Sequence, residues 1–243
     1  MRDTAPGLGD LHERLDAARS VTVLTGAGIS AESGLPTFRG AGGLWRTHRV
    51  EELASLQGFA RDPDLVWTWY NERSAAHQSV EPSPAHRALA AIERRVPDFT
   101  LVTQNVDSLH VRAGSRNVLE LHGSLREAKC TQCDARRPFA LRRAQDDGGS
   151  YLHECGGMWR PDIVWFGESL PPAALAAAFD AARRADLMLV VGTSGIVQPA
   201  ASLATKRATG AYVVEVNPEE TVLTAQVDRS IRARASDVLP GLA

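Results

Sequence analysis

Four polar turns in this sequence, each directly after a short apolar run, carry groups that can bind a ligand. The turns are TGAGIS, TQNVDSLH, VGTSGIV and EVNPEE. The first fits the pattern G-x-G-x-x-G/A, in which glycines let the backbone approach a pyrophosphate at the start of a helix. The second offers an amide and a carboxylate, which suit a carboxamide and ribose hydroxyls. Together the turns indicate a dinucleotide site.

Two further groups of residues could take part in chemistry. His122, in LELHGS, is a candidate general base because an imidazole with a pKa near 6.5 suits that task at neutral pH. In WTWYNER, Tyr70 and Arg73 lie three apart, on one helix stripe with Val66 and His77. Two interpretations stay open: an arginine that lays its stem along the surface, or a phenol and a guanidinium directed at one anionic group.

The elements that must position these residues alternate between strands and helices. Apolar, β-branched runs at 21–26, 99–105, 187–194 and 211–217 are typical of strands buried on both faces, as in a parallel sheet. Helical patterns separate or flank them at 11–19, 63–78, 83–95, 173–185 and 200–208. This alternation predicts an α/β, doubly wound fold, in which ligands bind beyond the carboxyl ends of the strands.

The segment after the glycine-rich turn disfavours an ordinary NAD dehydrogenase. That class needs a second strand ending in Asp or Glu about 20 residues on. The chain instead runs ESGLPTFRGAGGLWR, which predicts a long loop over whatever the turn holds.

Composition limits the function classes. A net charge of −2 and a pI near 6.4 give no sign of nucleic-acid or membrane binding, and the apolar runs are too short to cross a bilayer. The N-terminal segment has no apolar core of the kind found in signal peptides. Three cysteines, two of them in a C-x-x-C, argue against a disulfide framework. We therefore expect a cytoplasmic protein, and a monomer is favoured.

Six segments together resemble the successive motifs of the sirtuins, a family of NAD-dependent protein-lysine deacylases. They are GAGISAESGLPTFRG, TQNVDSLH, LHGS, RPDIVWFGE, GTS and VNPE, in the order of the family. The resemblance covers about residues 15 to 240. It implies one catalytic domain over 1–243, with a Rossmann-like NAD-binding part at about 10–125 and 160–240. A small zinc-ribbon-like module at about 126–159 would be inserted into it.

The resemblance also implies site residues. His122, Asn105 and Asp107 would be catalytic. Residues expected to bind NAD are Gly26, Ala27, Gly28, Ser30, Pro36, Thr37, Phe38, Arg39, Trp45, Gln104, Asn105, Val106, Asp107, Gly192, Thr193, Ser194, Asn217, Pro218, Glu219 and Ala235. The backbone of Val164, Trp165, Phe166 and Gly167 would pair with an extended substrate peptide.

The family's mechanism gives His122 its role. The acyl oxygen of the substrate attacks C1′ of the nicotinamide ribose, nicotinamide leaves, and the imidazole activates a ribose hydroxyl. The expected products are nicotinamide, a free lysine and O-acyl-ADP-ribose.

A sirtuin subgroup that removes succinyl and malonyl groups carries a Tyr-x-x-Arg pair in its acyl pocket. Tyr70 and Arg73 match this pair, and GAGGLW at 40–45 also resembles that subgroup. A guanidinium and a phenol suit a carboxylate at the end of an acyl chain, and one such charge-assisted bond contributes about 1.5–3 kcal/mol. We therefore expect a preference for acidic acyl groups, with a generalist deacetylase as the alternative.

The metal site departs from the family pattern. A structural zinc needs four Cys or His ligands, and Cys130, Cys133 and Cys155 provide three. Leu152 stands where the third cysteine is expected, and His153 is a substitute at an awkward spacing of two from Cys155. Either His153 completes the site or the site is degenerate, and the sequence slightly favours the second.

Two other functions stay open. A mono-ADP-ribosyltransferase could use the same activated ribose, and a non-catalytic NAD or ADP-ribose sensing module would bind the cofactor without releasing nicotinamide.

Overall fold

A six-stranded parallel sheet forms the centre of the computed structural model, which describes residues 8–37, 49–133, 135–139 and 151–243. Its strands are β1 Ser20–Thr25, β2 Asp98–Thr103, β3 Val118–Glu120, β7 Leu187–Val191, β8 Tyr212–Val216 and β9 Arg229–Ile231. All neighbours pair in parallel, in the order β3-β2-β1-β7-β8-β9. Counted along the sheet's own strands this is the Rossmann order 3-2-1-4-5-6, with the switch point between β1 and β7.

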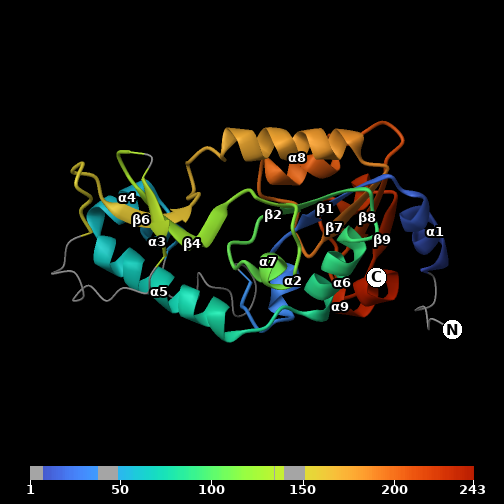
Figure 1. The fold of residues 1–243 in the computed structure, drawn as a ribbon, viewed down its shortest axis with the longest axis horizontal. Coiled ribbons are helices and arrows are strands. Elements are labelled where there is room, and N and C mark those ends of the chain that lie inside the picture. The colour runs from blue at the N-terminus through green and yellow to red at the C-terminus, as the bar shows by residue number, and fades with distance from the viewer. Residues whose placement is uncertain (1–7, 38–48, 134, 140–150) are drawn as a thin grey trace.

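Helices cover both faces of this sheet (Figure 1). The longer ones are α1 Gly9–Ala17, α6 Pro84–Glu93 and α8 Pro172–Arg184, and the shorter ones are α2 Ala27–Ala31, α7 Leu109–Arg112, α9 Ala235–Val238, η2 Ala200–Ala204, η3 Thr224–Gln226 and η4 Leu239–Leu242. Side chains alternate across each strand. In β7, Leu187, Leu189 and Val191 therefore pack with α1, α6 and α9, while Met188 and Val190 pack with α8 and η2. This two-sided burial explains why the strands have near-continuous apolar sequences.

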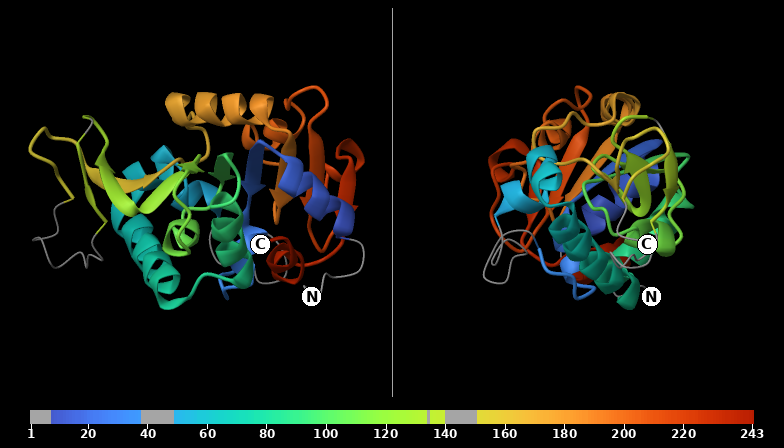
Figure 2. Two further views of the ribbon diagram at one scale, coloured as in Figure 1. Left: turned by 45° about the vertical axis from the view of Figure 1, so that its right-hand side comes forward. Right: turned by 90° about the vertical axis from the view of Figure 1, so that its left-hand side faces the viewer.

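A second unit lies at the end of the molecule opposite β8 and β9 (Figure 2). It contains a three-stranded antiparallel sheet and three helices: β4 Gly123–Cys130, β5 Arg136–Pro138, β6 Trp159–Ile163, α3 Val50–Leu53, α4 Leu56–Arg61 and α5 Pro63–Ser79. Its apolar side chains form a separate core that includes Phe59, Trp67, Tyr70 and Trp165. The same core contains Val106, from the turn after β2, so it reaches the edge of the parallel sheet.

The helix that carries WTWYNER begins where its sequence predicts. Asp62 caps α5 by accepting a hydrogen bond from the backbone N–H of Leu65 at 2.9 Å, and Pro63 occupies the first turn. Its buried residues include Val66, Tyr70, Arg73 and His77, the stripe expected from a spacing of three and four.

The predicted helix at 200–208 is wrong: the segment forms only the 3-10 helix η2, which ends at Ala204. The Ser202 hydroxyl donates to the carbonyl of Pro199, and the Thr205 hydroxyl donates to the carbonyl of Ser202. The N–H groups of Ser202 and Thr205 bond the same carbonyls, three residues back, at 3.1 Å each, which is the pattern of a 3-10 helix. In the described part of the chain, no helix has the length and apolarity needed to cross a membrane.

Candidate functional site

The glycine-rich turn after β1 packs against the turn after β7, at the switch point of the sheet. The N–H of Gly26 donates to the carbonyl of Val191 at 3.1 Å, and the N–H of Gly28 donates to that of Gly192 at 2.8 Å. A Cβ on Gly28 would lie 2.7 Å from the Cα of Gly192, and Gly192 has a positive φ of 59°. The glycines are therefore needed to join the two turns closely.

A buried polar network links the turn after β2 to the glycine-rich turn. The side-chain amide of Asn105 donates to the carbonyl of Gly26 and to Ser30 Oγ, both at 3.1 Å. Ser30 in turn donates to Asp107 Oδ2 at 2.7 Å. Burial raises the pKa of Asp107, while the hydrogen bonds from Leu109 and Ser30 and the charge of Arg73 act in the opposite direction. The network fixes Asn105 and Asp107 at the carboxyl edge of the sheet.

A second set of bonds holds the turns after β7 and β8. Gln104 donates through Nε2 to the hydroxyl of Thr193 at 2.9 Å, and Asn217 donates through Nδ2 to the carbonyl of Thr193 at 3.0 Å. The predicted residues Ser194, Pro218 and Glu219 stand in the same two turns. Ala235 differs: it is buried in the core at the start of α9. All four polar turns thus meet at one edge of the sheet, as the sequence predicts.

His122 lies between the two units, directly before β4. Its Nδ1 is 2.9 Å from the carbonyl oxygen of Gln104. A carbonyl can only accept, so Nδ1 carries the proton and Nε2 holds a lone pair. Burial lowers the pKa of His122, and the bond to Gln104 opposes that shift. The neutral imidazole is therefore oriented and ready to take a proton through Nε2.

Tyr70 and Arg73 are both buried, at 3% and 8% exposed. The surface interpretation of Arg73 is thus wrong, because α5 turns this face toward the second core and the site. Burial raises the pKa of Tyr70 to about 12 and lowers that of Arg73 to about 10, so at neutral pH the phenol keeps its proton and the guanidinium its charge. The guanidinium lies 4.6 Å from the centre of the Trp69 ring and also acts on the pKa of Asp107.

The run Val164–Gly167 continues from β6 past His122. Several of its N–H groups bond within the chain: Val164 to the carbonyl of His122, Trp165 to Glu168 Oε2, and Phe166 to the carbonyl of Ala54. The side chain of Phe166 is exposed, and Gly167 has a positive φ of 86°. A peptide that adds to this run as a strand would therefore bond mainly to the carbonyl groups of residues 164–167.

Four potential metal ligands converge in the second unit. One ligand atom from each of Cys130, Cys133, His153 and Cys155 lies within 4.8 Å of all the others. Sγ of Cys155 is 3.5 Å from Sγ of Cys130, 3.6 Å from Sγ of Cys133 and 3.1 Å from Nδ1 of His153. Ligands of tetrahedral zinc lie about 3.5–3.8 Å apart, so the two sulfur–sulfur separations match, while Nδ1 of His153 lies closer to Cys155 than a bound metal would place it. In type and number the four donors suit a structural zinc.

The turn from His153 to Gly157 explains how a spacing of two can work. The N–H of His153 donates to the carbonyl of Gly157, and the N–H of Gly156 donates back to that of His153. This tight turn directs Nδ1 of His153 toward the thiols, while Leu152, at the expected cysteine position, is 63% exposed. Of the two alternatives that the sequence left open, the geometry favours the complete site.

Three predicted cofactor residues, Phe38, Arg39 and Trp45, and the segment 40–45 lie outside the described residues. Pro36 and Thr37 lie at the end of the described segment that follows α2, with Pro36 exposed and Thr37 half-buried.

Sequence reasoning missed a buried histidine pair below the site. The rings of His86 and His110 lie 4.6 Å apart, and Nε2 of His110 is 2.9 Å from the hydroxyl of Thr25 at the end of β1. Burial lowers the pKa of both histidines, which are therefore neutral. A His at the third position of a helix with a Ser N-cap, as at His86 and Ser83, was the available signal for a capping role.

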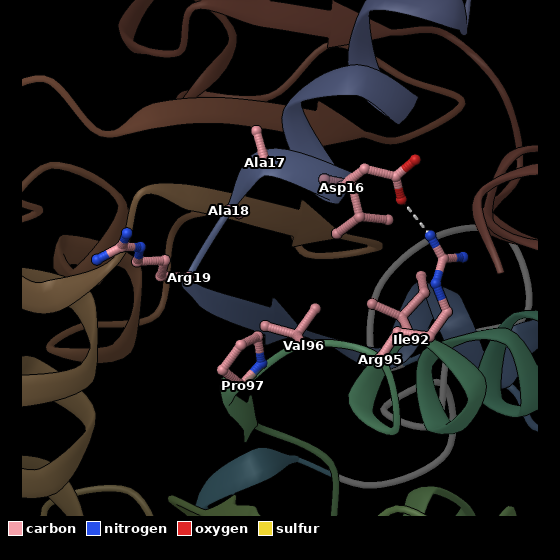
Figure 3. A pocket seen from close by; sticks show the side chains of 9 residues that line it. Asp16, Ala17, Ala18, Arg19, Ile92, Arg95, Val96 and Pro97 are labelled. Atoms are coloured by element: carbon pink, nitrogen blue, oxygen red, sulfur yellow. Dashed lines mark hydrogen bonds and ion pairs between the residues drawn. The ribbon is translucent and has the colours of Figure 1, made fainter.

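A separate pocket lies at the opposite edge of the sheet (Figure 3). Arg19 and Pro97, directly before β1 and β2, line it together with Asp16 and Arg95, which form an ion pair. Because this is the amino-end edge of the strands, the pocket is not part of the candidate site.

The donor set at the carboxyl edge fits NAD. Side-chain amides, a carboxylate and hydroxyls surround two closely joined glycine turns, which matches the hydrogen-bonding groups of a dinucleotide.

Comparisons with known proteins agree with this geometry. A model of the Sir2 family matches residues 26–199. NAD-dependent protein deacylase 1 of Pseudomonas aeruginosa is 49% identical over 240 residues, 95% of each chain. A solved Sir2 homolog–NAD complex has a TM-score of 0.89 and 46% identity, covering 96% of this chain and 91% of that one. A Sir2 protein with a deacetylated p53 peptide and 3′-O-acetyl ADP-ribose has a TM-score of 0.88 and 31% identity, covering 97% and 96%.

Proposed function

Because this chain belongs to the Sir2 family, we propose that it is an NAD-dependent protein-lysine deacylase that prefers acyl groups ending in a carboxylate, such as succinyl and malonyl. The observation that carries the preference is the burial of Arg73 on the same helix face as Tyr70. A charged guanidinium away from water favours an anionic partner strongly. The charge of Arg73 acts on the pKa of Asp107, which supports an acyl-binding face close to the predicted ribose site.

His122 acts as the general base in this proposal. When bound, NAD supplies the ribose carbon that receives the acyl oxygen. The Gln104 carbonyl holds the imidazole so that Nε2 can accept a proton from a ribose hydroxyl. Asn105 and Asp107, fixed by Ser30 and the carbonyl of Gly26, position the ribose and the carboxamide.

The proposal is tested by nicotinamide release from NAD with acetyl-lysine and succinyl-lysine peptides of one sequence. We expect turnover on both, with a higher kcat/KM for the succinyl peptide. Equal values would make the protein a generalist deacetylase. NAD binding without any turnover would support a sensing module, and label from NAD retained on the protein substrate would support an ADP-ribosyltransferase.

The pH dependence of kcat/KM should follow the titration of His122. The base form is the unprotonated imidazole, so activity rises with pH through the His122 pKa and then levels off. Burial lowers this pKa, so the half-maximal point should lie below about pH 6.5, the usual value for histidine. Initial rates measured between about pH 5 and 8 give the profile. A half-maximal point at or above the usual value would contradict this account of His122.

We further propose that His153 completes a structural zinc site with Cys130, Cys133 and Cys155. Thiolates and a neutral imidazole would hold the metal and join the strands of the second sheet. Replacement His153→Ala should lower zinc affinity at least about tenfold, which is about 1.4 kcal/mol and roughly 3–6 °C in the midpoint of thermal unfolding. Competition for zinc with a chelator measures the affinity, and melting curves measure the midpoint of thermal unfolding. His153→Cys should retain the zinc affinity, and Leu152→Ala should match the unmodified protein. An unchanged zinc affinity in His153→Ala would exclude His153 as a ligand.

A further inference from the structure

Within the described residues, one hydrogen bond holds the hydroxyl of Tyr70, and chemistry fixes its direction. Nε1 of Trp165 lies 2.8 Å from the Tyr70 hydroxyl oxygen, and both side chains are buried. An indole N–H can only donate, so the Tyr70 oxygen must accept. The phenol's own proton is therefore left to donate to another acceptor.

An ion pair between the buried Arg160 and the half-buried Glu168 holds Trp165 in place. Its backbone N–H donates to Glu168 Oε2 at 2.8 Å, and the Arg160 guanidinium lies 3.8 Å from the centre of its ring. Arg160, only 2% exposed, binds Glu168 through two bonds of 3.0 and 2.5 Å and donates to the carbonyl of Ile163 at 2.7 Å. The Phe59 ring packs 5.4 Å from the indole. These contacts fix the orientation of the indole N–H.

We propose that Trp165 is a specificity-determining positioning residue, which orients the Tyr70 hydroxyl as a donor to the terminal carboxylate of the acyl group. This inference rests on the proposed acidic-acyl preference and deepens it. Tyr70 keeps its proton at neutral pH because burial raises its pKa to about 12. Arg160 and Glu168 act one step further away, through Trp165.

The oriented Tyr70 hydroxyl should favour acyl groups that end in a hydrogen-bond acceptor. The Tyr70 oxygen already accepts a hydrogen bond from the indole N–H, so the phenol interacts with the acyl group by donating its proton. A carboxylate is a strong acceptor for this proton. An acetyl group has no such acceptor at its end. Loss of the indole N–H should therefore weaken succinyl turnover more than acetyl turnover.

The conservative replacement Trp165→Phe removes the N–H and keeps an aromatic ring. We expect it to lower the succinyl-to-acetyl ratio of kcat/KM by about threefold to tenfold, the value of one neutral hydrogen bond. The change should arise mainly in KM for the succinyl peptide, because the residue acts on binding of the acyl end rather than on His122.

A double-mutant cycle with Tyr70→Phe separates this role from general packing. If Trp165 acts through the Tyr70 hydroxyl, Trp165→Phe should lower the ratio in the unmodified protein and have little further effect on it in the Tyr70→Phe background. Additive losses of the ratio, or equal losses on both peptides, would overturn the inference. Either result would leave the acidic-acyl preference of the unmodified protein standing.

Trp67→Phe is the matched control. Trp67 is equally buried, and its Nε1 donates to the carbonyl of Trp159 at 3.1 Å rather than to Tyr70. This variant should lower the midpoint of thermal unfolding without changing the succinyl-to-acetyl ratio. An unmodified protein without any succinyl preference would overturn both the inference and the acyl part of the proposed function, so the two failures are distinguishable.

Discussion

Replacement of His122 by Asn should lower deacylation by about two to four orders of magnitude, the usual contribution of a general base. The Asn side chain can still donate to the Gln104 carbonyl, which receives the Nδ1 proton of His122 at 2.9 Å. It offers no basic nitrogen where Nε2 lies, so a ribose hydroxyl would lose its proton acceptor. Initial rates of acyl-peptide turnover measure the loss.

The location of His122 separates this effect from damage to the cofactor site. Its hydrogen bond is to the backbone of Gln104, while the glycine turns are held by Asn105, Ser30 and Asp107. NAD affinity, measured by calorimetry, should therefore change little in His122→Asn. His12→Asn is a matched control, because His12 on α1 is half-buried and also bonds a backbone carbonyl, that of Gly241. Retained turnover in His122→Asn would exclude the imidazole as the base.

Replacement of Arg73 by Met should lower kcat/KM for a succinyl-lysine peptide by about tenfold to a hundredfold. This range corresponds to a charge-assisted hydrogen bond of about 1.5–3 kcal/mol. Methionine keeps much of the volume of the buried stem but removes the charge. An acetyl-lysine peptide carries no carboxylate on its acyl group, so its turnover should fall far less and the ratio of the two should shift toward acetyl.

Two measurements keep this prediction specific to the acyl group. The thermal midpoint of Arg73→Met shows whether the fold survives the loss of a buried cation. Arg94→Met removes a similar side chain from an exposed position at the end of α6 and should leave both rates unchanged. If Arg73→Met lowers both rates equally while remaining folded, Arg73 supports the site without reading the acyl group.

The sequence predicted the fold because the relevant signals are local and repeated. The runs at 21–26, 99–105, 187–194 and 211–217 are apolar on both faces, which only a sheet covered by helices on two sides permits. The predicted doubly wound sheet and the resemblance to sirtuins are both confirmed. The predicted helix at 200–208 is instead a short 3-10 helix. Ser202 and Thr205 bond carbonyls three residues back through both their N–H groups and their hydroxyls, a detail that helical periodicity does not contain.

The sequence by itself thus determined the sheet, the four polar turns at its carboxyl edge and the residue types available there. Only the tertiary structure decided which of them meet and how exposed they are. Arg73 could be assigned to the surface or the interior until the packing of α5 showed it buried. The sequence did not show whether His153 lies near the cysteines, and the turn before Gly157 brings its Nδ1 close to the thiols. Trp165 meets Tyr70 across 95 residues of chain. Such contacts depend on how separate elements pack together, and side-chain spacing within one element carries no information about them.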